Sequence, residues 1–294
     1  MVGQKLEPEA NENRPESLYH YTTENGLYGI LKSDCIWATH YKFLNDLSEC
    51  LDAPELFEAR IRQLSSVKSP QLAVSRSRAV RAAYWSNIRN TLRARIESAD
   101  AYFVSFTDES TSQMPGDRLT LWRGYGEKCQ GFSLGFRRSK LEQRIRSFEQ
   151  RLQKQIQLMK CLYGETEEST QERGAIIETL VGFVSSQILG QVLEWSARFK
   201  NRTFYEEREW RFVLQMSAAE SNSGFVEFHD GRFGRTPHIA VPLDLKCQNS
   251  PLERIVVGPA PEKEQAVARL KIELAQMGIN GVEVVPSQIP YRNW

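Results

Sequence analysis

"LYHYTTENGLYGILKSDCIWATHY", residues 18–41, decides the fold expected at the start of the chain. Its first five residues alternate between two faces. Leu18, His20 and Thr22 would share one face of an extended chain, and Tyr19 and Tyr21 would share the other. The aromatic and β-branched side chains also favour extended structure. This run therefore predicts a short strand that carries His20.

The rest of that stretch predicts a helix and then a second strand. Leu27, Ile30 and Leu31 recur at helical spacing within "ENGLYGILKS", residues 24–33. "CIWATHY", residues 35–41, returns to the strand pattern. The chain thus opens as strand, helix, strand.

Further along, helical and strand-like segments alternate in blocks. The patterns predict helical regions at about 47–98 and 137–198, and strands in "ADAYFVSFTDES" and across most of the last third. "EKEQAVARLKIELAQMG" predicts one helix among those last strands. The fold expected is α+β, with a mixed or antiparallel central sheet and two inserted helical blocks. Residues 1–17 are expected to form a flexible tail, and residues 18–294 a single domain.

Composition sets limits on the protein class. Among 294 residues, 38 basic and 37 acidic side chains give a net charge of +1, which excludes a chain steered as a whole toward nucleic acid. No run approaches the roughly 20 apolar residues of a membrane span, and the polar N-terminus does not resemble a secretion signal. Five scattered cysteines suggest neither a zinc ribbon nor a redox dithiol. We therefore expect a cytoplasmic protein, with no membrane contact and no metal.

The most informative charged segment is "YEEREWRF", residues 205–212. If it is a strand, Glu207, Glu209 and Arg211 share one face, and Trp210 and Phe212 anchor the other. Two carboxylates would then lie about 7 Å apart along the strand. In a sheltered cleft such a pair raises each other's pKa and can stabilise a developing cation. The alternative is a solvent-exposed strand face on which Arg211 balances the two acids.

Three other segments carry candidate residues. "LTLWRGYG" places Trp122 and Tyr125 before a glycine-rich turn, where an aromatic ring could stack on a planar ligand, although core packing also explains Trp122. "SFTDES" offers polar side chains at a strand end. His229 and His238 are isolated in the sequence, and no phosphate loop, dinucleotide fingerprint, nucleophile elbow or zinc-protease motif is present.

Several spaced motifs, in this order, resemble a bacterial family known only as domain of unknown function 2971. They are "LYHYT", "GLYGIL", "IWATHYKFLND", "VSFT", "LWRGYGEKCQGFSLGF", "FKNRTFYEEREWRF", "ERIVVGP" and "PSQIPYR". The resemblance runs nearly from end to end of the chain. It implies no activity, because the family has none assigned.

"LYHYT" followed by "GLYGIL" and an aromatic strand is also similar to the first half of the ADP-ribosyltransferase fold, and "EERE" is similar to that superfamily's acidic third motif. The resemblance implies a catalytic set of His20, Glu207 and Glu209. Glu209 would bind the 2′-hydroxyl of the nicotinamide ribose and stabilise the oxocarbenium-like transition state, while Glu207 would orient the acceptor. His20 would hold the ribose and carboxamide region of NAD.

The same resemblance implies a cofactor site around His20. Tyr41 or Trp37 would stack on the nicotinamide, and which aromatic fills this motif stays open. The residues expected to contact the cofactor are His20, Tyr21, Thr22, Trp37, Tyr41 and Tyr125. This hypothesis requires His20 and Glu209 to open into one cleft.

Three functions follow as hypotheses. The first is an NAD-consuming ADP-ribosyltransferase or NAD glycohydrolase, acting as an intracellular toxin or phage-defence effector on an unknown protein or nucleic-acid acceptor, with a regulatory protein partner. The second is a nuclease or RNA-binding effector that uses Asp46, Glu207 and Glu209 as an acid cluster, with Arg208 and Arg211 on phosphates. The third is a non-catalytic interaction or sensor domain.

Overall fold

A computed structural model describes most of the chain outside two long segments. The described residues are 14–45, 100–127, 129–154, 156–163, 196–216, 224–231 and 234–290, with Ser86, Asn90, Arg93, Ala94 and Glu97. The chain divides into two compact units, of which the first consists of residues 1–34, 106–144 and 243–294, and the second of residues 35–105 and 145–242. Within the described residues, no helix is both long and apolar enough to span a membrane.

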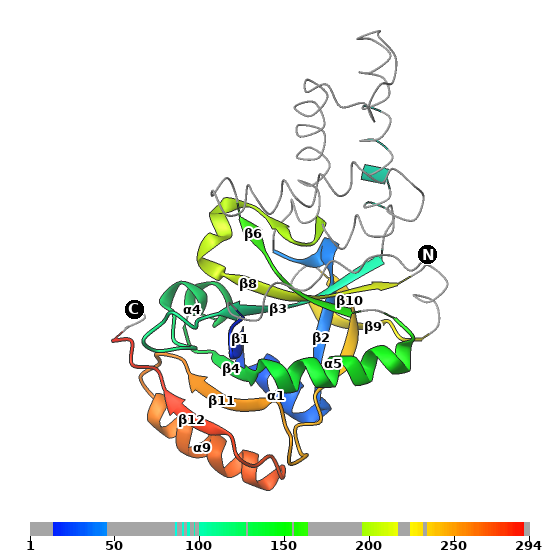
Figure 1. Cartoon of the computed structure of the whole chain (residues 1–294). Coiled ribbons are helices and arrows are strands. Elements are labelled where there is room, and N and C mark those ends of the chain that lie inside the picture. The colour runs from blue at the N-terminus through cyan, green and yellow to red at the C-terminus, as the bar shows by residue number, and fades with distance from the viewer. Residues whose placement is uncertain are drawn as a thin grey trace. The chain divides into compact units, whose positions relative to one another are not determined.

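The first unit is built on strands in the order β12-β11-β4-β1-β3 (Figure 1). Neighbouring strands are antiparallel, except that β11 and β12 are parallel. The strands are β1 (Ser17–Thr22), β3 (Asp100–Asp108), β4 (Phe132–Arg137), β11 (Leu252–Val257) and β12 (Glu283–Pro286). Only the last residues of β3, from Phe106 on, belong to this unit. Thr107 of β3 pairs with Tyr19 of β1.

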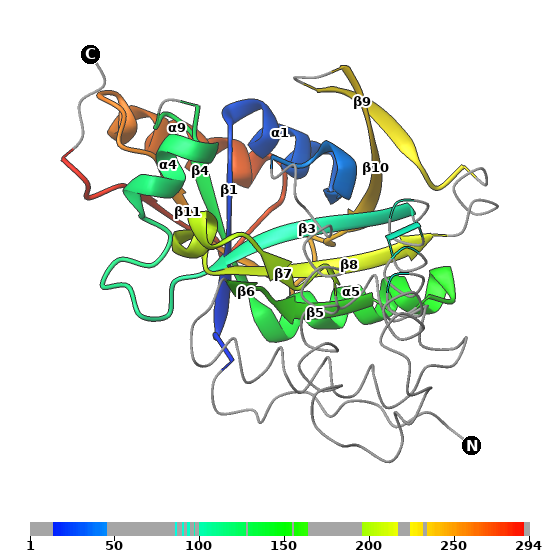
Figure 2. The same cartoon turned by 90° about the horizontal axis from the view of Figure 1, so that it is seen from above.

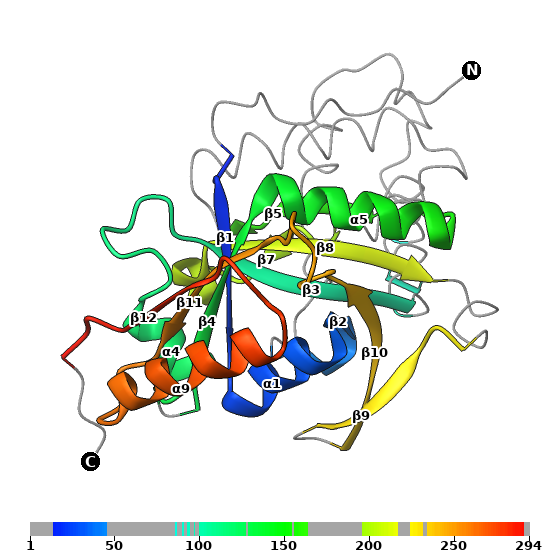
Figure 3. The same cartoon turned by 90° about the horizontal axis from the view of Figure 1, so that it is seen from below.

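Three helices accompany these strands: α1 (Glu24–Ser33), α4 (Leu119–Tyr125) and α9 (Lys263–Gln276). The side chain of Thr23 caps α1 by accepting a hydrogen bond from Gly26 N, and Leu27, Ile30 and Leu31 form its buried face. In Figure 3, α9 lies alongside β12, with which it is in contact. The helix predicted at residues 24–33 is therefore confirmed.

The two tyrosines of β1 form the core under α4. Tyr19 and Tyr21 pack with Trp122 and Leu121 of that helix, and Tyr21 meets the Trp122 ring edge-on at 4.7 Å between centroids. Opposite Tyr19 on β4 lies Gly135, where an added Cβ would come within 2.8 Å of the tyrosine ring. A side chain at that position would force the Tyr19 ring or the backbone of β4 to shift.

The second unit contains two further sets of antiparallel strands. In one, β3 is followed by β2, β10 and β9, and in the other β8 lies between β3 and β5 (Figure 2). These strands are β2 (Cys35–His40), β5 (Ile156–Lys160), β8 (Glu209–Met216), β9 (Glu227–Gly231) and β10 (Gly234–Pro242). A small parallel pair joins β6 (Leu162–Tyr163) to β7 (Phe199–Lys200), and the 3-10 helices are η2 (Tyr41–Phe43) and η4 (Arg202–Glu207).

The α+β class and the largely antiparallel strand pairing agree with the sequence analysis, at that level of detail. Two local expectations are wrong. The region at 137–198 is helical over α5 (Arg138–Leu152), but β5 and β6 follow it. The strand expected at residue 205 begins at Glu209, because the residues before it form η4. The expected helical region at 47–98 lies almost wholly outside the described residues, and the single domain stays a prediction.

Candidate functional site

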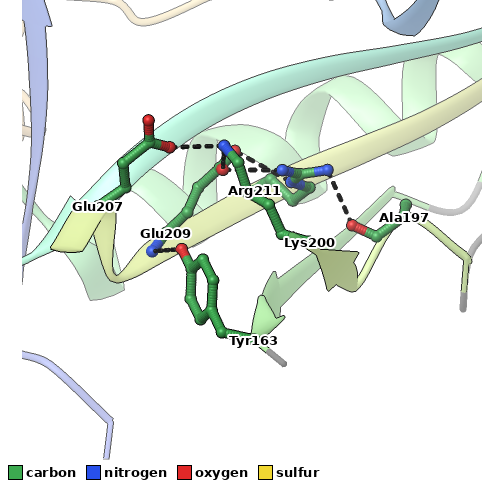
Figure 4. A network of polar contacts seen from close by, with 6 residues as sticks. All are labelled: Tyr163, Ala197, Lys200, Glu207, Glu209 and Arg211. Atoms are coloured by element: carbon green, nitrogen blue, oxygen red, sulfur yellow. Dashed lines mark hydrogen bonds and ion pairs between the residues drawn. The ribbon is translucent and has the colours of Figure 1, made fainter. Parts of the chain in front are cut away.

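A buried set of charged side chains lies at the start of β8 in the second unit (Figure 4). Glu209 accepts hydrogen bonds from Arg211 at both carboxylate oxygens, at 3.0 Å from Nε and 2.7 Å from Nη2. Lys200 Nζ donates to the same Glu209 and lies 2.5 Å from a carboxylate oxygen of Glu207. Glu209 is 2% exposed and Arg211 is fully buried. Two carboxylates and two cations thus balance one another in a place with little access to water.

The backbone before β8 explains why two acids meet one lysine. Helix η4 ends at Arg208, which takes the left-handed conformation with φ of 44°. Glu207 therefore lies on η4 rather than on β8, and its carboxylate and that of Glu209 both contact Lys200. The main chain of Glu209 is also held, because its N–H donates to the Tyr163 hydroxyl at 2.7 Å and its carbonyl accepts from Cys161 N at 2.8 Å.

Arg211 is fixed on its other side as well. Its Nη1 donates to the carbonyl of Ala197 at 2.9 Å, and its guanidinium lies over the Phe103 ring at 5.1 Å from the centroid. A planar guanidinium that makes a two-point contact with a carboxylate and stacks on an aromatic ring has little freedom to move. The position of Glu209 is therefore imposed by its surroundings.

Opposing effects act on the pKa of Glu209. Burial alone would raise this pKa, but the charges of Arg211 and Lys200 and their hydrogen bonds outweigh burial and lower it to about 2. The carboxylate is therefore ionised at neutral pH. The expectation that the two neighbouring acids raise each other's pKa is wrong for Glu209, because two cations lie in direct contact with it. The alternative of a solvent-exposed strand face is also wrong.

Glu207 differs from Glu209 in its access to solvent. The Glu207 side chain is 16% exposed, against 3% for Glu209. Two residues earlier on η4, Tyr205 is 51% exposed and meets the Tyr163 ring edge-on at 5.6 Å between centroids. The rim of the charged set therefore offers a reachable carboxylate beside an exposed aromatic ring.

A second buried carboxylate, Glu109, lies in the first unit and is fully buried. It accepts hydrogen bonds from the Tyr21 hydroxyl and from Gly116 N, both at 2.7 Å, while Arg118 Nε stays 3.9 Å away. Burial raises the pKa of Glu109, and these contacts oppose that shift only in part. The sequence analysis did not single out this residue.

Of the residues predicted around His20, the first unit contains His20, Tyr21, Thr22 and Tyr125, and the second contains Trp37 and Tyr41. His20 is partly exposed on β1, with its ring 6.0 Å from that of Phe106. Tyr21 is buried, and its hydroxyl donates to Glu109 and accepts from Arg118 N at 3.0 Å. Thr22 is partly exposed at the end of β1. Since Glu209 belongs to the second unit, a shared cleft with His20 stays a prediction.

The predicted aromatic residues differ in exposure. Tyr41 is 3% exposed and packs against His40 and Phe103, so its ring is part of the core. Trp37, in contrast, is 40% exposed on β2. Tyr125 is partly buried at the end of α4, packed against the cluster that contains Trp122. Of the two rings considered for nicotinamide stacking, Trp37 is therefore the one that a ligand can reach.

Two members of the charged set were missed by the sequence analysis, namely Lys200 and Tyr163. Lys200 stands in "FKNRTF", which was noted only as part of a family motif. Tyr163 lies in a region expected to be helical. Neither their residue type nor their spacing in the sequence predicts a contact with Glu209, because these contacts depend on the tertiary fold. Asp46, expected in the alternative acid cluster, lies outside the described residues.

Residues 121–212 match a family model described as protein of unknown function (DUF2971). The similarity to this family is therefore shown for that segment of the chain. This match confirms the family predicted from the spaced motifs, and the segment contains Lys200, Glu207, Glu209 and Arg211. No curated protein matches the chain. The similarity to ADP-ribosyltransferases stays a prediction.

Proposed function

We propose that this DUF2971 protein consumes NAD, by breaking the bond between nicotinamide and ribose and passing ADP-ribose to water or to a macromolecular acceptor. The observation that carries the proposal is the pair of carboxylates on Lys200, one buried and one reachable from solvent. An oxocarbenium-like centre needs a fixed negative charge close to it more than it needs an acid, because nicotinamide leaves as a neutral molecule.

In the proposed reaction the bond between C1′ and the nicotinamide nitrogen breaks, and its electron pair leaves with nicotinamide. An acceptor oxygen then bonds to C1′, and its proton passes to the carboxylate of Glu207. Water as acceptor gives hydrolysis, and a macromolecular hydroxyl gives transfer. All bonds and charges balance without a metal or a redox partner.

The burial of the two acids changes the roles inferred from the sequence. Glu209 was expected to touch the ribose, but its exposed fraction of 2% gives that role to Glu207 in our proposal. Glu209 becomes a positioning residue, which holds Lys200 so that Glu207 points to the rim. Tyr205, half-exposed on the same 3-10 helix, offers a surface for a planar or sugar ring.

No disulfide joins the cysteines in the described part of the chain, which is compatible with our proposal of a reducing, cytoplasmic setting. In that setting the protein would act as an intracellular toxin or phage-defence effector. His20 remains proposed as a contact to the cofactor.

Release of nicotinamide from NAD by the purified full-length chain, with and without cell extract as a source of acceptors, tests the proposal. Glu207→Gln keeps an oxygen for Lys200 but loses the charge, so we expect release to fall about 100-fold. Glu206→Gln removes a neighbouring exposed acid from the same helix and should retain the wild-type rate. No release by the wild type under any acceptor, or a fully active Glu207→Gln, would refute the proposal.

A further inference from the structure

His229 lies on β9 and His238 on β10, two antiparallel strands that run side by side (Figure 3). The Nδ1 atoms of His229 and His238 lie 3.1 Å apart. On the other edge of the His238 ring, Nε2 lies 3.7 Å from a carboxylate oxygen of Glu227, the residue directly opposite on β9. The expectation that these histidines are isolated is therefore wrong.

The protonation of this pair is restricted by its geometry. Two nitrogens that face each other at 3.1 Å have room for one hydrogen between them. His238 is 3% exposed in its side chain, and its buried Nε2 has no hydrogen-bond partner within the described part of the chain. The nearby Glu227 carboxylate favours a hydrogen on Nε2, which leaves Nδ1 of His238 with a free lone pair directed at His229.

We propose that His229 and His238 bind a divalent transition-metal ion through their Nδ1 atoms. Two imidazole nitrogens at 2.0–2.1 Å from a tetrahedral zinc ion are separated by about 3.3 Å, close to the observed 3.1 Å. Imidazole suits zinc, copper and nickel, and copper binds such sites most tightly. The site is separate from the charged set around Glu209 and does not depend on the proposed function.

Glu227 completes the arrangement as an orienting residue. A histidine that binds a metal through one nitrogen commonly donates the hydrogen on its other nitrogen to a carboxylate. A small movement of the exposed Glu227 side chain would bring it into hydrogen-bond range of His238 Nε2. The described residues provide no third histidine, cysteine or acid for the ion, so water or a bound ligand would fill its other positions.

Trp37 provides a reporter for the ion. Its ring centroid lies 4.5 Å from that of His229 and 4.4 Å from that of His238, and the two histidine centroids are 4.9 Å apart. Three nearly equal separations place both histidines on one side of the indole. A paramagnetic ion held between them would therefore quench the fluorescence of Trp37.

The test is a titration of the untagged full-length chain with Cu²⁺, Ni²⁺ and Zn²⁺, followed by calorimetry and tryptophan fluorescence. We expect one ion per chain, Cu²⁺ bound most tightly, quenching by Cu²⁺, and displacement of Ni²⁺ by Zn²⁺ in excess. Trp37→Phe should bind the ion and lose most of the quenching. His229→Ala, at a partly exposed position, should weaken binding at least 10-fold, and Glu227→Gln about 10-fold.

Asp230→Asn is the matched control, because Asp230 neighbours His229 on β9 but points to the other face of the strand. Because the Asp230 carboxylate acts electrostatically on His229, this variant should lose some affinity, but less than Glu227→Gln loses. His238→Ala could unfold the hairpin, so its unfolding midpoint is measured without metal. Absence of one-to-one binding in the wild type, or unchanged affinity in His229→Ala, would overturn the proposal.

Discussion

Two buried glutamates, one in each unit, have pKa shifts of opposite sign. Glu109 in the first unit accepts hydrogen bonds from neutral donors, and burial raises its pKa. Glu209 in the second unit is just as inaccessible to solvent, but Arg211 and Lys200 lower its pKa to about 2. Burial does not by itself fix the charge of an acid. The number of cations in direct contact decides whether burial or attraction dominates.

The two glutamates also differ in role, because Glu109 is structural and Glu209 belongs to the proposed reaction site. Glu109 joins β1 to the segment before α4 through the Tyr21 hydroxyl and Gly116 N. Glu209 instead fixes the lysine that its more exposed neighbour Glu207 also contacts. A permanently ionised carboxylate that orients a second, reachable one is what the proposed cleavage of NAD requires.

The largest effect is expected for Glu209→Gln. Because the folded pKa of Glu209 is lowered, its ionisation stabilises the protein above its ordinary pKa, and this contribution is lost as pH falls toward about 2. The shift corresponds to about 3 kcal/mol at pH 7. Urea unfolding of the variant should show a loss of this size at pH 7, and the gap to the wild type should close between about pH 4.5 and pH 2. A loss below about 1 kcal/mol at pH 7 would contradict the account.

Tyr21→Phe should have a smaller effect in the first unit. It removes the hydroxyl that donates to Glu109 and accepts from Arg118 N, so two buried polar groups lose a partner. We expect a loss of about 1–2 kcal/mol in the free energy of unfolding. Tyr28→Phe, at a less buried position whose hydroxyl contacts Glu273, serves as the control and should cost less. Equal losses in both variants would argue against the importance of burial.

Glu109→Gln tests whether the pKa of Glu109 is shifted in the direction opposite to that of Glu209. A raised folded pKa means that Glu109 stabilises the protein most below its ordinary pKa, and that this contribution is lost as pH rises through the folded pKa. Since Gln resembles the protonated acid, the variant should match the wild type at pH 4 and be more stable than the wild type at pH 7. Glu209→Gln should show the reverse trend.

The smallest effect is expected where the ion pair is exposed. Arg269 and Glu24, in the first unit, contact each other with side chains that are 53% and 50% exposed. Arg269→Ala should change the free energy of unfolding by less than about 0.5 kcal/mol, and salt should reduce even that. A larger loss would mean that direct contact, rather than burial, explains the strength of the Glu209 contacts.

Local patterns in the sequence were sufficient for the elements around β1. The alternation of residues 18–22 and the spacing of Leu27, Ile30 and Leu31 predict β1 and α1, because both follow from neighbours in the chain. "IQLMK" was assigned to a helix, since a five-residue segment of mixed apolar and polar residues beside a long charged helix does not reveal its partner β8.

The candidate site was predictable only in part. Residue types identified Glu207 and Glu209, but not the left-handed turn at Arg208 that divides the assumed strand, nor the contact of both acids with Lys200. His229 and His238 are nine residues apart, and only the pairing of β9 with β10 brings their rings together. These contacts depend on tertiary structure, which residue spacing along one chain does not encode.

The most direct test of the central claim is a pH titration of the Glu209 and Glu109 carboxyl carbons by NMR, with glutamate-selective labelling and assignment through Glu209→Gln and Glu109→Gln. We predict that Glu209 stays ionised until the pH approaches about 2, while Glu109 titrates above the ordinary range of glutamate. A Glu209 that takes up its proton at or above the ordinary value would contradict the account, because Lys200 and Arg211 would then not hold it as a fixed negative charge.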